Sequence, residues 1–321
     1  MDLSALVARA DPDELLREID ACVERRDWEG LLALRDRCDA AVERGHQLWP
    51  VANHAEYRLA LDAPGEWAAA VLVDAAGRFA PGPLAEVASE RHEWSELEPF
   101  VTPGPVAVLA LHERVVRGED LRACAVPGPE VIDVPRVLSD WEPQYALAEY
   151  RADRADFPSP PPPDFGEFEP LVGAPVVADL VAVDALLALV RAWTVSSDAR
   201  AQAVAVAGDA RAAVGALGVG SARFAPISHT EAFAWMAWAA ANGGANGRRR
   251  GAALGRYDAW CTASALCGFD GPATSRDLAD AIVEVNWYLW TTVEPPGWVC
   301  NLAVEDRADG CAWALTAVDA T

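Results

Sequence analysis

The chain has 321 residues, of which 52% are apolar, and a formal net charge of −23. This length suffices for a large buried core and suggests two domains of about 100–200 residues, which excludes a disordered or fibrous protein. The acidic balance disfavours binding to nucleic acid or to anionic lipid, because both require a cationic surface.

The beginning of the chain lacks the features of a secretory signal, because its second residue is acidic and no charged segment precedes an apolar run. No apolar stretch reaches the about 18 residues that a membrane-spanning helix needs. The seven cysteines are scattered through apolar stretches, which is typical of free thiols in a reducing compartment. We therefore expect a soluble, cytoplasmic protein that does not bind membranes.

All 26 basic residues are arginine, so the chain contains no lysine. Reactions that need a lysine are excluded, including Schiff-base formation, pyridoxal-phosphate chemistry and phosphate binding by a P-loop or kinase lysine. A coding bias that also enriches Ala, Gly and Pro is the simpler cause of this composition. Selection against modification of lysine is the alternative.

Residues 11–117 predict a series of short helices. The first begins with Asp11 as N-cap, Pro12 and Glu14, followed by apolar residues at helical spacing. A second follows Asp27 and stops at Gly45. Further starts are expected near Pro50, Gly65, Pro83 and Pro105. Paired helices would give units of about 33 to 39 residues, which suits either a helical-hairpin array or an irregular bundle.

The best domain boundary is the acidic segment 141–170, which contains five prolines between positions 158 and 163. Consecutive prolines favour extended polyproline geometry, so we expect a semi-rigid linker. The predicted organisation is a mainly α helical-hairpin domain at 1–140, the Pro-rich acidic linker at 141–170 and an α+β domain at 171–321.

The second domain is predicted to mix helices with short strands. Strands at 202–208 and 222–227 flank a helix at 209–217, and Ser228 and Glu231 form a capping box before the next helix. Three runs after residue 283 alternate apolar and polar residues, which predicts an antiparallel β-meander at the C-terminus with one buried face. Tyr288 and Trp290 fall on the opposite face, where they could contribute to a binding surface if exposed.

The most distinctive motif is a turn rich in glycine and arginine that joins two predicted helices. Glycines allow close approach of a ligand, and guanidinium groups can hold phosphate or carboxylate with two hydrogen bonds. The predicted anion-binding residues are Asn242, Asn246, Arg248, Arg249, Arg250 and Arg256. This function requires free, solvent-facing guanidinium groups. The alternative is that these arginines pair with acids of residues 1–140.

Within this turn, Arg248, Gly251 and Ala253 resemble the R/Q-x-x-G-x-G/A signature of acetyltransferases. The resemblance implies binding of the pyrophosphate of acetyl-CoA, although in that family a strand precedes the motif and here a helix is predicted.

Other chemical signatures are missing from the sequence. Three histidines stand close to glutamates, but HExxH does not occur and none of the three belongs to an ExxH pair, so we predict no metal site and no cofactor. These pairs are His54/Glu56, His92/Glu93 and His112/Glu113. G-x-S-x-G and CxxC are also missing, and no catalytic residue is identified.

We favour a non-catalytic protein–protein interaction or adaptor protein whose acidic helical array contacts a protein partner. The alternative is an enzyme or sensor that binds a phosphate- or carboxylate-bearing small molecule of CoA or nucleotide type at the arginine-rich turn. Contact of the same arginines with nucleic acid is disfavoured by the overall charge.

Overall fold

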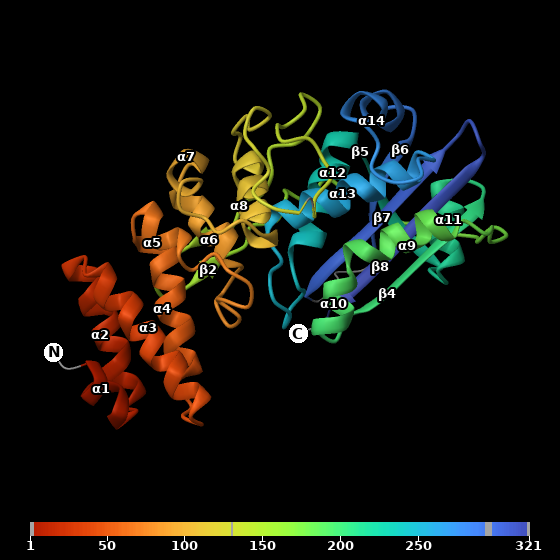
Figure 1. Ribbon diagram of the computed structural model, residues 1–321. Helices are drawn as coiled ribbons and strands as arrows, with labels where there is room; N and C mark the ends of the chain where they lie inside the picture. Colours follow the sequence, from red (N-terminus) through yellow and green to blue (C-terminus); the bar gives the residue numbers. More distant parts are fainter. Residues whose placement is uncertain (1–2, 130, 293–296, 320–321) are drawn as a thin grey trace. The chain divides into compact units, whose positions relative to one another are not determined.

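The computed structural model describes residues 3–129, 131–292 and 297–319, and its chain forms two compact units (Figure 1). Unit 1 consists of Met1–Ile132 and Ala148–Phe157, and unit 2 consists of Asp133–Leu147 and Pro158–Thr321. The segment 141–170 is therefore divided between the units. Its role as a linker and the domain limits expected around it stay predictions.

Unit 1 is mainly helical, as the sequence predicted. Asp11 caps one helix by accepting hydrogen bonds from the backbone N–H groups of Asp13 and Glu14, and Asp27 caps the next. The sequence did not predict two short helices, α1 and α7. The helices are α1 (Leu3–Arg9), α2 (Pro12–Arg25), α3 (Trp28–Glu43), α4 (Trp49–Asp62), α5 (Gly65–Ala69), α6 (Leu84–Arg91), α7 (Trp94–Leu97) and α8 (Pro105–Val116).

A two-stranded hairpin, β1 (Glu149–Tyr150) and β2 (Ala155–Asp156), completes unit 1. Tyr150 is fully buried, and its hydroxyl donates a hydrogen bond to Glu86 of α6 at 2.6 Å. Its backbone N–H donates to Glu90 at 2.8 Å. Gly82 lies so close to the Tyr150 ring that a side chain there would collide with it. These contacts fix the hairpin on α6.

Unit 2 is built on an antiparallel sheet in the strand order β3-β5-β6-β7-β8-β4. Its strands are β3 (Glu169–Pro170), β4 (Arg200–Ala207), β5 (Ser221–Ile227), β6 (Asn286–Thr291), β7 (Trp298–Asp306) and β8 (Cys311–Asp319). The consecutive neighbours β6, β7 and β8 confirm the predicted meander. The helices are α9 (Leu180–Leu189), α10 (Arg191–Ser196), α11 (Ala210–Ala216), α12 (His229–Ala241), α13 (Ala252–Leu266) and α14 (Ser275–Ile282).

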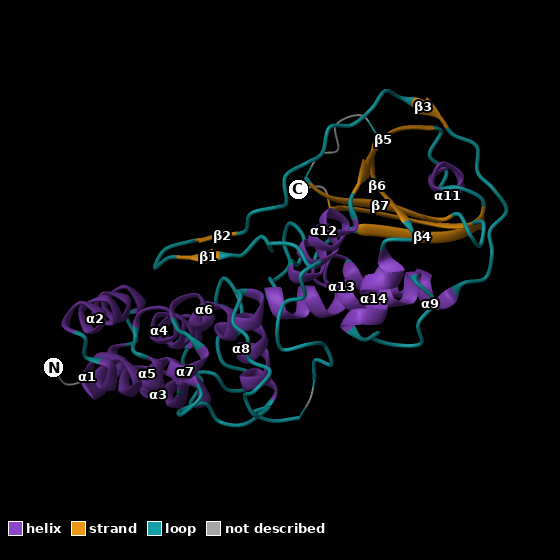
Figure 2. Ribbon diagram, turned by 90° about the horizontal axis from the view of Figure 1, so that it is seen from above, coloured by secondary structure: helices purple, strands orange, loops and turns teal. Residues whose placement is uncertain are grey.

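Helices cover both faces of this sheet, with α11 on one side and α9, α12 and α13 on the other (Figure 2). The prediction of a single buried face was therefore wrong. Tyr288 and Trp290 are 9% and 3% exposed and pack in one cluster with Val214 of α11. Small residues on this face, such as Ala303 and Ala312, allow α11 to approach the strands closely.

The proline-rich segment continues into a strip that follows β5 within unit 2. The backbone N–H of Gly166 donates to the carbonyl of Phe224 at 3.0 Å. The guanidinium carbon of Arg223 lies 5.9 Å and 5.2 Å from the ring centroids of Phe165 and Phe168. The segment is thus held by backbone and cation–π contacts.

Candidate functional site

The turn predicted to bind anions lies between α12 and α13. Asn242 is buried, accepts a hydrogen bond from Nη1 of Arg249 at 2.8 Å, and donates to the carbonyl of Trp238 at 2.7 Å. The backbone N–H of Ala245 donates to the carboxylate of Asp319 at 2.6 Å. The turn therefore holds a carboxylate, but one that belongs to β8 of the same chain.

The arginines of this turn differ in exposure. Arg249 and Arg256 are 6% and 1% exposed, whereas Arg248 and Asn246 are exposed. Nη1 of Arg250 donates to Asp258 at 2.5 Å. The structure thus joins Arg249 to Asn242 and turns Arg256 into the core.

Arg256 is held by the segment 133–147 of unit 2. Its Nε and Nη2 donate to the two carboxylate oxygens of Glu142 at 2.6 and 2.8 Å, and the carbonyls of Pro135 and Val137 accept two further hydrogen bonds. The acids that pair with Arg250 and Arg256 are thus Asp258 and Glu142, both outside residues 1–140. Ligand binding by the six residues stays a prediction.

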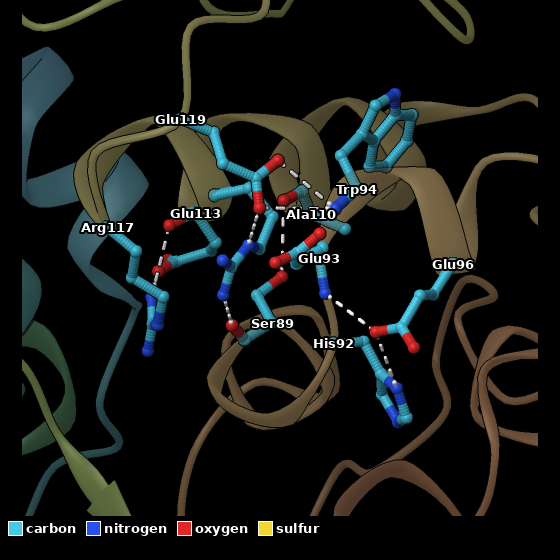
Figure 3. A network of polar contacts seen from close by, with 10 residues as sticks. Ser89, His92, Glu93, Trp94, Glu96, Ala110, Glu113, Arg117 and Glu119 are labelled. Atoms are coloured by element: carbon cyan, nitrogen blue, oxygen red, sulfur yellow. Dashed lines mark hydrogen bonds and ion pairs between the residues drawn. The ribbon is translucent and has the colours of Figure 1, made fainter.

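The histidines beside glutamates lie in unit 1, and Figure 3 shows one of the pairs, His92 and Glu93, together with Glu113. Nδ1 of His92 lies 3.6 Å from Glu96, and Arg117 donates to Glu113 at 2.8 Å. Within the described residues, no group of three His, Cys, Asp or Glu side chains is arranged to hold a metal ion. These glutamates serve helix ends and ion pairs.

Burial suppresses the reactivity of several thiols. It raises the pKa of Cys22 and Cys38 to about 11 and that of Cys300 to about 12. These thiols stay protonated at neutral pH, and the protonated form is a poor nucleophile. They therefore behave as core residues.

Unit 2 has a cleft of about 340 Å³ at the N-terminal end of α12, with Tyr145, Pro160 and Trp235 in its lining. The 13 residues of α12 span about 20 Å at about 1.5 Å per residue. The arginine-rich turn lies at the opposite end of this helix. None of the six predicted residues lines this cleft.

A second cleft, of about 390 Å³, lies in unit 1 beside the start of α4, and we call it the aromatic cleft. Its lining includes Trp49, Asn53, His54, Tyr57, Phe79 and Asp153. The rings of Trp49 and Phe79 pack with centroids 4.3 Å apart, yet the two residues stay 39% and 55% exposed. Exposed aromatic side chains of this kind are typical of binding surfaces.

Three side chains of α4 fix the walls of the aromatic cleft. Asn53 accepts a hydrogen bond from the backbone N–H of Phe79 at 3.0 Å and donates to the carbonyl of Trp49 at 2.9 Å. Glu56 accepts from the N–H of Gly77 at 2.7 Å. The hydroxyl of Tyr57 donates to the carbonyl of Arg151 at 2.6 Å, which holds the turn carrying Asp153. The walls are therefore pre-organised.

The titratable groups of the aromatic cleft favour a neutral or negative interior. Burial and the nearby Arg58 lower the pKa of His54, so its imidazole is neutral at neutral pH. Burial also raises the pKa of Tyr57 to about 12, so its hydroxyl stays a donor. Within the described part of the chain, Asp153 forms no ion pair. The guanidinium carbon of Arg78 lies 5.7 Å from the Phe79 ring centroid.

This cleft was not predicted from the sequence. Trp49, Phe79 and Asp153 are far apart in the sequence, and no local motif joins them. The available signal was Trp49 at the first position of a helix, directly before Pro50. A large aromatic residue there is not needed to start the helix.

The comparisons with known proteins assign no activity. The sequence model of one protein family, described as a family of unknown function (DUF6183), matches residues 13–320. No curated protein and no solved structure matches the chain. Among the described helices, none combines the length and apolar character that crossing a bilayer requires.

Proposed function

We propose that this chain, which belongs to the DUF6183 family, is a non-catalytic protein–protein interaction or adaptor protein. In this proposal, unit 1 binds a protein partner through the aromatic cleft. The supporting observation is the exposed pair Trp49 and Phe79 on pre-organised walls. Tryptophan is enriched among the residues that dominate binding energy at interfaces. Fixed walls reduce the entropy lost on binding.

The charge of unit 1 supports a protein partner rather than an anionic one. Its segments contain 28 Asp and Glu residues against 15 Arg residues. Such a surface attracts a basic partner and repels nucleic acid. All seven cysteines are free, which agrees with the proposed cytoplasmic location.

The small-molecule alternative receives less support. Arg249 and Arg256 are buried, and Arg256 already binds a carboxylate of its own unit. A ligand would have to displace these contacts, and leaving Glu142 buried and unpaired would cost free energy.

The test is affinity capture from a lysate of the native cell, quantified by mass spectrometry. We compare the wild-type chain with the double variant Trp49→Ala/Phe79→Ala. Removing two interface aromatics should cost about 2 kcal/mol or more in binding, which weakens the affinity about 30-fold. Proteins captured by the wild-type chain should therefore be lost from the double variant.

The matched control is Phe100→Ala, because Phe100 is a half-exposed phenylalanine of unit 1 outside the aromatic cleft. It should capture the same proteins as the wild-type chain. Circular dichroism checks that all three chains are folded. Equal recovery of every captured protein by the double variant would refute the proposal.

A further inference from the structure

We infer that the aromatic cleft binds a cationic side chain of the partner, the guanidinium of an arginine or the ammonium of a lysine. This inference rests on the proposed function, because it specifies which part of a protein partner enters the cleft. It names a ligand chemistry that the overall charge alone does not give.

The aromatic rings provide the first argument. The face of a Trp, Tyr or Phe ring attracts a cation within about 6 Å of its centroid, and Trp does so most strongly. Phe79 already holds the guanidinium of Arg78 at 5.7 Å. Trp49 lines the cleft beside it and is 39% exposed. The cleft therefore presents the surface that a cation prefers.

The charges around the cleft provide the second argument. Asp153 brings a carboxylate to its lining, and His54 is neutral at neutral pH. The two arginines of the same turn, Arg151 and Arg154, lie next to acids: 3.3 Å from Glu149 and 3.6 Å from Asp156, respectively. Their positive charges are thus offset locally. A cation in the cleft would be attracted by Asp153, and this attraction must outweigh the repulsion from Arg78 beside the Phe79 ring.

The pinned walls provide the third argument. Asn53 and Tyr57 hold the Phe79 loop and the Asp153 turn by hydrogen bonds of 3.0 and 2.6 Å. The ring and the carboxylate are thus in place before a ligand arrives. Cation–π attraction is weak at exposed sites, so it contributes to binding only where little entropy is lost in fixing the side chains of the site.

The competing occupant is a proline-rich segment, because aromatic grooves also bind polyproline helices. A polyproline ligand carries no charge and would gain nothing from Asp153. The negative charge of unit 1 therefore favours the cationic occupant.

The experiment titrates the full chain with short peptides and follows binding by calorimetry and by the indole N–H signal of Trp49 in NMR. One peptide contains two arginines between Gly and Ser residues, a second contains lysines, and a third contains citrulline, the neutral isostere of arginine. A fourth peptide contains six prolines. Titrations at low and high salt separate two contributions to binding, because salt screens the general attraction by acidic residues but leaves the contact with the aromatic rings.

We expect the arginine and lysine peptides to bind and the citrulline peptide to bind about tenfold more weakly. Phe79→Ala and Trp49→Ala should each weaken arginine-peptide binding about fivefold, and Asp153→Asn about threefold. The matched controls Phe100→Ala and Asp74→Asn should leave it unchanged, because both residues are exposed in unit 1 but outside the cleft.

Several results would overturn the inference: no binding of the arginine peptide, equal binding of arginine and citrulline peptides, preference for the proline peptide, or no effect of Phe79→Ala. Failure of the proposed function looks different. If the peptides behave as expected but Trp49→Ala/Phe79→Ala still captures every cellular protein, the cation site stands and the partner-binding role fails. If the captured proteins are lost but the peptides do not discriminate, only the cation inference fails.

Discussion

Removing the Arg256 guanidinium should destabilise unit 2 more than removing any exposed charge. The side chains of Arg256 and Glu142 are 1% and 0% exposed and form two parallel hydrogen bonds. In Arg256→Met, the Glu142 carboxylate stays buried without its cation and keeps hydrogen bonds from the hydroxyl of Tyr145 at 2.5 Å and the backbone N–H of Ser139 at 2.8 Å. Breaking a buried pair from one side costs about 3–5 kcal/mol.

The assay is urea unfolding followed by tryptophan fluorescence, which reports mainly on unit 2 because nine of the 13 tryptophans belong to it. With a slope of about 2 kcal/mol per molar urea, the transition midpoint should fall by about 1.5–2.5 M. The matched control is Arg250→Met, because the Arg250 and Asp258 side chains are 30% and 17% exposed. Solvent screens that pair, so the expected cost is about 1 kcal/mol.

The double variant Arg256→Met/Glu142→Leu shows whether the lost stability comes from a buried, unpaired charge or from lost packing. It buries no unpaired charge, so it should cost less than the sum of the two single variants, with a coupling of about 2 kcal/mol. If Arg256→Met costs no more than Arg250→Met, or if the single effects add, the reasoning from buried charge is refuted.

Three further outcomes are expected. Gly255→Ala should lower the free energy of unfolding of unit 2 by about 1–3 kcal/mol in urea titrations, because the new methyl group would collide with the carbonyl oxygen of Ala237. The control is Gly220→Ala, because a methyl group there would meet open space. Equal losses of stability in the two variants would contradict the predicted collision. At pH 8 a thiol reagent should leave the buried Cys22, Cys38 and Cys300 unmodified in the folded chain. Peptide mapping that finds these cysteines labelled would refute their burial. The affinity for the arginine peptide, measured by calorimetry, should stay constant as the pH falls to 6.5, the ordinary pKa of histidine, and should decrease only at lower pH. The reason is that the pKa of His54 is lowered, so its imidazole gains a positive charge only below pH 6.5. If the affinity decreases in the same way in His54→Gln, the decrease comes from the protonation of another group.

The local signals in the sequence were sufficient for much of the fold. Asp11 and the Ser228–Glu231 box act on amide groups two or three residues away, so their neighbours alone reveal them. Period-two alternation likewise predicted the strands β6, β7 and β8. The burial of Trp290 was missed because it depends on α11, which lies elsewhere in the sequence and crosses the second face.

The candidate site was harder to predict because its parts meet only through tertiary contacts. The hydrogen bond between Tyr57 and Arg151 joins residues 94 positions apart. In the arginine-rich turn, the local charge density was visible in the sequence, but the side chains that pair with its arginines were not. Glu142 lies 114 positions from Arg256.

The division of the chain between the units affects the order in which they can form during synthesis. Unit 1 is complete only when the ribosome has released the β1–β2 hairpin, whose Tyr150 fills the space beside α6. By then residues 133–147 have also emerged, although they belong to unit 2. Glu142 must therefore remain hydrated while 114 further positions are translated, until Arg256 arrives to neutralise it.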